Sequence, residues 1–443
     1  MARQYFGTDG IRGRVGQHPM TAEFALRLAS AAARVLAPTG GRVMIGKDTR
    51  VSGYMFESAL EAGFVAAGMD VDLLGPLPTP GIAVMTQAAS ADLGVVISAS
   101  HNPYYDNGIK FFDRSGAKLS DAIEEQIEAH LGEAAITRES ESLGRARRFE
   151  AAIEQYQRFA IGTLPEGLRL DGLRIVVDCS HGAGYKVSPR TLTELGAEII
   201  PVGCSPNGRN INAGCGSTQP ELMRLMVRGV GADLGVAFDG DGDRLVMADR
   251  EGNLVDGDQL LYVLALDRHA RGVLKGPVVG TLMTNLGLEK ALAATGIGFR
   301  RARVGDRYVM ELLRESGGVL GGESSGHILC LDKTTTGDGL VTALQVLAVM
   351  RQSGRSLADL VAGMRRYPQV LINVKTSRRI DLAAPGVLRE AVEGVERALG
   401  DRGRVVLRAS GTEPVVRVMV EGESESDVQR HAESIARVVS AAG

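Results

Sequence analysis

Residues 91–103 read Ala-Asp-Leu-Gly-Val-Val-Ile-Ser-Ala-Ser-His-Asn-Pro, an apolar run of strand length that ends in a polar turn. The first five residues recur at 232–236, where the run leads into Asp-Gly-Asp-Gly-Asp-Arg at 239–244. A looser third copy, Gly-Val-Leu at 318–320, leads into Gly-Gly-Glu-Ser-Ser-Gly-His at 321–327. Open α/β sheets bind ligands at the carboxyl ends of their strands. The repeat therefore predicts three related α/β units that each present one loop to a shared cleft.

The sequence around these stretches alternates between apolar runs of strand length and amphipathic segments of helix length. One alternation covers 42–45, 54–68 and 71–74, and another covers 173–179, 189–196 and 198–202. This pattern is typical of βαβ units with mixed, largely parallel sheets.

The C-terminal part predicts a smaller α+β unit with a mixed or antiparallel sheet. Its pattern indicates strands at 369–375, 404–407 and 414–420 and helices at 387–399 and 426–441. We therefore expect four domains, at 1–150, 151–253, 254–366 and 367–443.

Composition limits the class of protein. The 443 residues are 44% hydrophobic and carry a net charge of −3, which allows a large core and gives no broad basic surface for nucleic acid. The four cysteines form no C-x-x-C pair, which favours reduced thiols. Since neither a signal peptide nor a membrane-spanning run is visible, we expect a cytoplasmic protein without a membrane partner.

Ser100, at the end of the first run, is a candidate nucleophile. A serine hydroxyl needs activation by a base, a metal or a cationic pocket. Lys110 is placed to supply positive charge, or to accept a proton if burial lowers its pKa. Asn107-Gly108 is expected to form a turn that leads into the strand containing Lys110. Taken alone, Ser100 is equally well explained as a turn serine that bonds its own backbone.

The acidic loop, residues 239–243, is a candidate metal site. If the segment is extended, Asp239, Asp241 and Asp243 point to one side. Oxygen ligands of this kind suit Mg²⁺. An EF-hand is excluded because its sixth and twelfth positions would be Arg244 and Arg250 instead of glycine and glutamate. The alternative is a solvated acidic turn, which the preceding core strand makes less favourable.

Two further loops could bind a phosphorylated sugar. In the glycine loop, residues 321–327, Glu323 and Ser325 suit vicinal hydroxyls and His327 could act as acid or base. In the arginine loop, residues 408–414 with Arg417 beyond it, two arginines, two hydroxyls and an open run of N–H groups make an anion nest. The alternatives are a glycine-rich connection and a hairpin with surface arginines. Weaker candidates are Arg12 and Arg50 beside the Ser100 loop, and sugar contacts from residues 305–308.

Together the four loops suit phosphoryl transfer on a phosphosugar, in which catalysis rests on positioning and charge neutralisation. The chain resembles the α-D-phosphohexomutase superfamily along its whole length, on the motifs at 98–103, 239–244, 322–327 and 408–414. The resemblance implies four domains around a central cleft and an activating phosphorylation at Ser100. It also implies one Mg²⁺ per active site, and a bisphosphorylated hexose as intermediate and activator.

The resemblance also implies the roles of single residues. Catalytic roles would fall on Ser100, Lys110, Arg12 and His327. The Mg²⁺ ligands would be Ser100, Asp239, Asp241 and Asp243. Substrate contacts would come from Arg244, Asp306, Arg307, Glu323, Ser325, Arg408, Ser410, Gly411, Thr412 and Arg417. Ser324 stands where many relatives carry a larger residue, and an alternating backbone would point it away from the sugar.

Within the superfamily, the chain resembles bacterial members that act on glucosamine phosphates, on the stretches at 6–13, 97–103, 207–212 with 215–217, and 304–309. The resemblance implies interconversion of glucosamine 6-phosphate and glucosamine 1-phosphate for UDP-N-acetylglucosamine and cell-wall precursors, and a homodimer. The alternatives are a member acting on glucose or mannose phosphates, a metal-dependent sugar phosphatase, and a phosphosugar-binding regulator without turnover.

Overall fold

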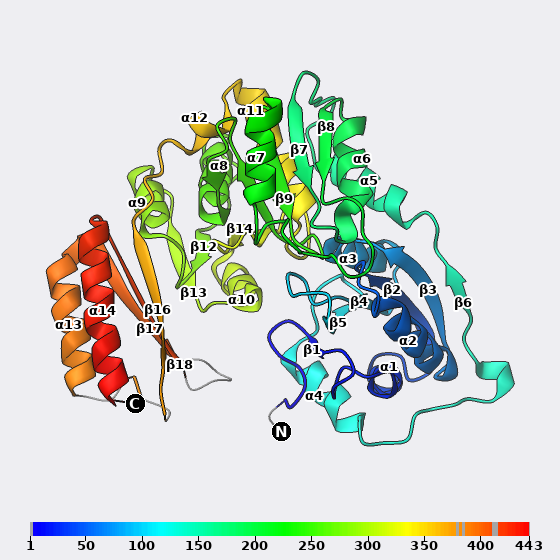
Figure 1. The fold of residues 1–443 in the computed structure, drawn as a ribbon. Helices are drawn as coiled ribbons and strands as arrows, with labels where there is room; N and C mark the ends of the chain where they lie inside the picture. The colour runs from blue at the N-terminus through cyan, green and yellow to red at the C-terminus, as the bar shows by residue number, and fades with distance from the viewer. Residues whose placement is uncertain (1–2, 378–380, 383–385, 410–414, 443) are drawn as a thin grey trace.

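The chain forms four β-sheets with flanking helices, described by a computed structural model for residues 3–377, 381–382, 386–409 and 415–442 (Figure 1). Figure 1 shows the four units following one another along an arc, from the first unit at the lower right to the C-terminal unit at the left. Within the described ranges, no helix combines the length and the apolar character that crossing a bilayer requires.

The first unit has a six-stranded sheet in the order β1-β5-β4-β2-β3-β6. Its strands are β1 (Ile11–Arg14), β2 (Gly41–Lys47), β3 (Met69–Pro76), β4 (Leu93–Ile97), β5 (Asp106–Asp113) and β6 (Ala146–Arg148). Its helices are α1 (Ala22–Leu36), α2 (Gly53–Ala66), α3 (Thr79–Ala88) and α4 (Asp121–His130), with the 3₁₀ turn η1 (Ser140–Ser142).

The second unit has a five-stranded sheet in the order β11-β10-β9-β7-β8. Its strands are β7 (Arg174–Asp178), β8 (Glu198–Val202), β9 (Leu234–Phe238), β10 (Leu245–Ala248) and β11 (Leu254–Val255). Its helices are α5 (Ala152–Gly162), α6 (Val187–Glu194) and α7 (Glu221–Val230), with the turn η2 (Ala183–Tyr185). Because β11 pairs with β10, this sheet extends two residues past the domain boundary expected at residue 253.

The third unit has a four-stranded sheet in the order β13-β12-β14-β15. Its strands are β12 (Val278–Thr281), β13 (Phe299–Ala302), β14 (Leu320–Gly322) and β15 (Ile328–Cys330). Its helices are α8 (Gly257–Ala270), α9 (Leu286–Ala294), α10 (Asp306–Ser316), α11 (Gly339–Ser353) and α12 (Leu357–Val361).

The internal repeat is confirmed as a repeat of topology. The four strands β5-β4-β2-β3 correspond to β10-β9-β7-β8 and to β15-β14-β12-β13. In each set the second strand runs antiparallel to the first and parallel to the third. The loop between the first two strands carries Ser100, the acidic loop or the glycine loop, so the three predicted loops occupy equivalent places.

The C-terminal unit is α+β with an antiparallel sheet in the order β16-β18-β17, which confirms the expected difference. Its strands are β16 (Gln369–Lys375), β17 (Gly403–Ala409) and β18 (Val415–Gly422), and its helices are α13 (Val387–Leu399) and α14 (Glu425–Ala442), with the turn η3 (Gly400–Arg402). Both helices pack on one face of the sheet around a core of their own.

The turn expected at Asn107-Gly108 is wrong, because both residues lie inside β5 and pair with β1. The chain turns earlier, between Ser100 and Tyr105. A Cβ on Gly108 would lie 2.6 Å from the carbonyl oxygen of Ser98. This glycine therefore allows a close approach of two backbones instead of forming a turn.

Candidate active site

Ser100 lies directly after the end of β4 and is only 1% exposed. Its backbone has φ = +51°, a left-handed conformation that is uncommon for a residue other than glycine. The side chain of Ser98 accepts a hydrogen bond from Ser100 N at 2.9 Å. In this conformation the hydroxyl of Ser100 donates to Asp239 of the acidic loop. The structure thus brings the first two predicted loops into direct contact.

The three carboxylates of the acidic loop converge, with ligand atoms all within 4.8 Å of one another. They do so through a turn and not through the extended backbone that we expected: Gly242 has φ = +74° and donates from its N–H to the carbonyl of Asp239 at 3.1 Å. The predicted extended backbone is therefore wrong, but the predicted convergence of the three carboxylates is confirmed. A turn achieves it because glycine tolerates the left-handed conformation.

The donor set of this loop suits a divalent cation. Burial and the charges of Asp243 and Asp241 raise the pKa of Asp239 well above its ordinary value. The Oδ1 atoms of Asp241 and Asp243 are buried without a hydrogen-bond partner. Unsatisfied buried carboxylate oxygens are costly unless a cation neutralises them. The residues present therefore fit a hard metal ion such as Mg²⁺.

Lys110, on β5, lies between two carboxylates and is 2% exposed. Its Nζ is 2.9 Å from Asp241 Oδ2 and 2.9 Å from Asp9 Oδ2. Burial alone would lower the pKa of Lys110, but Asp241 and Asp9 outweigh it and the pKa is raised. The lowered pKa that would have made Lys110 a base is therefore not found, and Lys110 lies in the cluster as a fixed positive charge.

His327, beside the acidic loop, also lies between two carboxylates. Its Nδ1 is 3.6 Å from Asp243 Oδ2, and its Nε2 is 3.6 Å from Asp306 Oδ2. Burial lowers the pKa of His327, but Asp243 and Asp306 raise it to about 9. The imidazole is thus held in its charged form near neutral pH, where it can give up a proton.

Arg12, on β1, joins the same cluster through Asp9, to which it is ion-paired. Asp9 also pairs with Lys110 and Lys118, and these cations hold the pKa of Asp9 well below its usual range in spite of its burial. Asp9 and Lys118 were missed by the sequence analysis. A signal was present, since Asp9 stands in the same Gly-rich loop as Arg12.

The third and fourth predicted loops meet at a cavity of about 360 Å³ between the third and the C-terminal units. Five of the expected substrate contacts line it: Arg244, Glu323, Ser325, Arg408 and Arg417. Arg408 on β17 and Arg417 on β18 are directly opposite in the antiparallel register. Like charges so placed repel each other, which makes this edge a suitable anion site.

Ser324, which we expected to point away from the sugar, is also among the residues that line this cavity. The backbone of residues 323–326 forms a turn, closed by a 2.9 Å hydrogen bond from Gly326 N to the carbonyl of Glu323. Alternation applies only to extended strands, so it does not decide the direction of Ser324.

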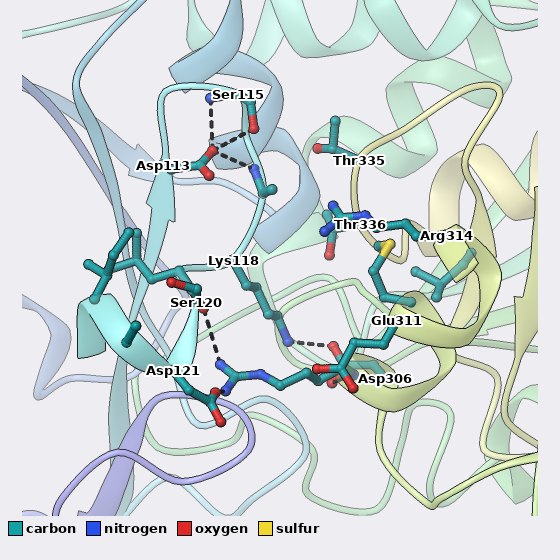
Figure 2. Close-up of a pocket in the computed structure, with 17 residues that line it drawn as sticks. Asp113, Ser115, Lys118, Ser120, Asp121, Asp306, Glu311, Arg314, Thr335 and Thr336 are labelled. Atoms are coloured by element: carbon teal, nitrogen blue, oxygen red, sulfur yellow. Dashed lines mark hydrogen bonds and ion pairs between the residues drawn. The ribbon is translucent and has the colours of Figure 1, made fainter. Parts of the chain in front are cut away.

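Asp306 and Arg307, at the start of α10, do not line this cavity, although Asp306 lies 3.6 Å from His327. Both line a larger cavity of about 650 Å³ between the first and third units, shown in Figure 2. Lys118 points from the first unit to Asp306 and forms an ion pair with it (Figure 2). Arg307 is paired with Asp121 and Glu124 of α4. The structure therefore places these two residues in interdomain ion pairs, apart from the cavity of the arginine pair.

The remaining expected contacts, Ser410, Gly411 and Thr412, lie outside the described residues. Two further neighbours of the site were not among our candidates. Thr79 donates to Asp241 Oδ2 at 2.7 Å, and His101 lines the cavity of the arginine pair with its Nδ1 3.3 Å from Ser100 Oγ. Burial and the charge of Arg244 lower the pKa of His101 to about 4.

Family models match almost the whole chain. They are described as phosphoglucomutase/phosphomannomutase alpha/beta/alpha domain I at residues 3–137, domain II at 154–252, domain III at 256–367 and the C-terminal domain at 371–438.

Curated relatives and solved structures point to the same family. A phosphoglucosamine mutase of Methylococcus capsulatus is 55% identical over 100% of this chain and 99% of its own length. One of Halorhodospira halophila is 58% identical over 99% and 97%. A solved structure of a putative phosphomannomutase from Thermus thermophilus matches with a TM-score of 0.79 at 24% identity, over 98% of each chain, and thus supports the fold.

Proposed function

The chain belongs to the phosphoglucomutase/phosphomannomutase family, and on that premise we propose that it interconverts glucosamine 6-phosphate and glucosamine 1-phosphate. Relatives named phosphoglucosamine mutase match the chain end to end at 55% identity or more. The main observation in support of this function is the hydrogen bond from the buried Ser100 hydroxyl to Asp239 of the acidic loop. This contact lies near the cavity that Arg408 and Arg417 line.

Ser100 acts as a phosphoryl carrier in this proposal. Phosphorylated Ser100 transfers its phosphoryl group to the free hydroxyl of the sugar phosphate. The bond from phosphorus to the serine oxygen breaks, a bond from phosphorus to the sugar oxygen forms, and the hydroxyl proton passes to a group of the site. The bisphosphorylated sugar then reorients in the cleft and returns its other phosphoryl group to Ser100. This step restores the phosphorylated form of the enzyme.

Charge neutralisation is the main contribution of the surrounding residues. Asp239, Asp241 and Asp243, with an oxygen of the phosphorylated Ser100, would hold Mg²⁺, which supplies positive charge beside the phosphoryl group when bound. Lys110 and Arg12 add fixed positive charge. The resemblance assigns proton transfer to Arg12, Lys110 and His327. The pKa of His327 is about 9, so the imidazole donates a proton near neutral pH and accepts the sugar proton only after it has lost its own.

Glu323 and Ser325 would bind the sugar hydroxyls, and Arg408 and Arg417 would hold the phosphate that is not reacting. Arg244 lines the same cavity, and its backbone N–H donates to Asp239 Oδ1 at 3.2 Å. Its side chain would contact the phosphoryl group that is being transferred. The proposed substrate contacts of Ser410, Gly411 and Thr412 are supported by the family motif alone. For Asp306 and Arg307 we propose contact with substrate only if their interdomain ion pairs open.

Ser100→Ala tests this function. We expect no phosphoenzyme in intact-mass spectra after incubation with a hexose bisphosphate, and a fall in turnover of at least about 1,000-fold. Ser115→Ala, which changes an exposed serine of the same unit, is the control and should behave as wild type. Normal turnover by Ser100→Ala would refute the assignment.

A second measurement tests the substrate. We expect kcat/KM to be highest for glucosamine phosphate when glucosamine, glucose and mannose phosphates are compared. A preference for glucose or mannose would move the function within the family, whereas release of inorganic phosphate without isomerisation would indicate a phosphatase.

We further propose a cytoplasmic location and a homodimer. The four cysteines are all unpaired, which favours a reducing compartment. The homodimer rests on the resemblance and is measured by sedimentation velocity.

A further inference from the structure

The backbone of Ser100 adopts a left-handed conformation, which is unfavourable for a serine. A left-handed residue other than glycine costs about 1–2 kcal/mol. Such a conformation persists only where the surrounding structure fixes it. The direction of the Ser100 side chain follows from this backbone, so whatever fixes the backbone also aims the hydroxyl at Asp239.

Arg50, in the loop after β2, is completely buried and contacts the Ser100 loop through its guanidinium group. Its Nη2 donates to the carbonyl of Ser100 at 2.9 Å, and its Nη1 donates to the carbonyls of Asn102 at 3.0 Å and Pro103 at 2.9 Å. Asp48 neutralises the charge, since Arg50 Nε donates to Asp48 Oδ2 at 2.9 Å. One planar side chain thus binds three carbonyl oxygens of the loop, a geometry that a lysine does not reproduce.

Asn212, from the second unit, binds the same carbonyl as Arg50. Its Nδ2 donates to the carbonyl of Ser100 at 2.9 Å and to that of Asn102 at 3.1 Å. Its own backbone is fixed by a 2.8 Å hydrogen bond from its N–H to the carbonyl of Ser180. The Ser100 loop is therefore tied to the unit that carries the acidic loop.

The acidic loop packs directly against this contact. A Cβ on Gly240 would lie 2.5 Å from the carbonyl oxygen of Ser100 and 2.8 Å from Asn212 Nδ2. No side chain other than hydrogen fits there. The carbonyl of Ser100, the amide of Asn212 and the backbone of the acidic loop thus form one packed unit across the boundary between the first two domains.

We propose that Arg50 and Asn212 are positioning residues for phosphoryl transfer. They hold the carbonyl of Ser100, keep this residue in its left-handed conformation and so direct its hydroxyl toward the acidic loop. Among the described residues, neither side chain hydrogen-bonds to a carboxylate of that loop, and neither lines the cavity of the arginine pair. Both therefore act through Ser100. This inference rests on the proposed role of Ser100 as phosphoryl carrier.

Asn212→Ala and Arg50→Lys test the proposal. We expect kcat to fall about 10- to 100-fold, because a small misplacement of a reacting group has an effect of this size. The KM for the sugar phosphate should stay within about twofold, since the lining of the cavity is unchanged. The rate of phosphoenzyme formation from a hexose bisphosphate, followed by intact mass, should fall with kcat. Asn212→Ala removes only one amide group, so it remains informative if Arg50→Lys does not fold.

Thr49→Val is the matched control. Thr49 precedes Arg50, and its hydroxyl donates to the carbonyl of His181 at 2.5 Å and not to the Ser100 loop, so it also ties this loop to the second unit. We expect a change in Tm similar to that of Asn212→Ala but a kcat within about twofold of wild type.

The proposal is overturned if folded Asn212→Ala and Arg50→Lys keep the wild-type kcat, if KM rises as much as kcat falls, or if Thr49→Val loses as much activity as they do. Ser100→Ala separates this failure from that of the proposed function. An active Ser100→Ala refutes the carrier role itself, whereas an inactive one beside fully active positioning variants refutes only the present inference.

Discussion

At the scale of single residues, the site is defined by charges that are buried together. Asp9, Asp241 and Asp243 lie among Lys110, Lys118 and His327; four of these six side chains are buried, and those of Asp9 and Lys118 are partly exposed. Buried charges are tolerated only where they are paired. In this set the Oδ1 atoms of Asp241 and Asp243 and the Nε2 atom of His327 have no hydrogen-bond partner, and the two carboxylate oxygens belong to the group that could hold a metal ion.

Removal of Mg²⁺ should therefore lower the stability of the protein. A ligand that binds only the native state stabilises it by about 2.7 kcal/mol at a hundredfold excess over its Kd. We expect wild type to gain Tm with Mg²⁺ over EDTA, and Asp241→Asn to lose most of that gain together with turnover. Asp171→Asn, which changes an exposed carboxylate of the same unit, should keep the gain. An equal gain in Asp241→Asn would place the cation elsewhere.

Arg417→Ala tests whether Arg408 and Arg417 bind an anion. Without an anion, Arg408 and Arg417 repel each other, so the substitution should leave Tm of the free protein unchanged or slightly higher. Because one charge-assisted hydrogen bond is worth about 1.5–3 kcal/mol, KM should rise about 10- to 100-fold. The measurement is KM together with Tm, with and without phosphate. An unchanged KM would contradict the anion site.

At the scale of elements, three of the four predicted loops stand at the ends of strands. Ser100 follows β4, the acidic loop follows β9, and the glycine loop begins within β14. At the start of α11, Asp338 accepts hydrogen bonds from Val341 N at 2.9 Å and from Tyr156 Oη of α5 at 3.0 Å. This helix cap also joins the second and third units.

The cap predicts a pH dependence of stability. Burial raises the pKa of Asp338 to about 7, in spite of its hydrogen bonds, and the like charge of Asp243 adds to the shift. The native state therefore keeps a proton that the unfolded chain loses near pH 4. The contribution of Asp338 to stability is complete below about pH 4 and is lost as the pH rises through 7.

Asp338→Asn, which cannot ionise and still caps the helix, should gain Tm relative to wild type between pH 5 and pH 8. The measurement is Tm of both proteins across this range in the same buffer series. Parallel curves would show that Asp338 is ionised throughout.

At the scale of the whole molecule, the three α/β units are joined more firmly to each other than to the C-terminal unit. One hydrophobic cluster, from Met44 to Met364, runs through the first three units, whereas the C-terminal unit has its own core. Arg404 binds the carbonyls of Leu282 at 2.7 Å and Thr284 at 2.6 Å, and Glu421 accepts from Leu286 N at 2.9 Å. The buried pair of Arg404 and Glu421 thus anchors this unit to the third.

Glu421→Gln should loosen the C-terminal unit. The change leaves Arg404 without its counter-ion in a largely buried place, which costs about 3–5 kcal/mol. We expect calorimetry to show a separate transition at lower temperature for this unit. Arg430→Ala, which breaks an exposed ion pair of the same unit, should change stability by no more than about 0.5 kcal/mol. A single transition at the wild-type Tm would show that other contacts suffice.

The sequence by itself predicted the fold class, which is confirmed, and it is the source of the chemistry that we propose for the four loops. An apolar strand followed by a polar turn is a local pattern, and its repetition at 91–103, 232–244 and 318–327 was enough to predict three related units. The choice of Ser100, the acidic carboxylates and Glu323 depended on residue types at close spacing, which a single stretch displays.

Only the tertiary structure decided which groups meet and in what state. The strand position of Gly108 depends on pairing with β1, and the raised pKa of Lys110 depends on Asp241, which is more than a hundred residues away, and on Asp9. The interdomain pairing of Arg307 and the contact of Arg50 and Asn212 with Ser100 join different loops or units. The physical reason is that burial and charge pairing are set by neighbours in space, and a local pattern does not contain them.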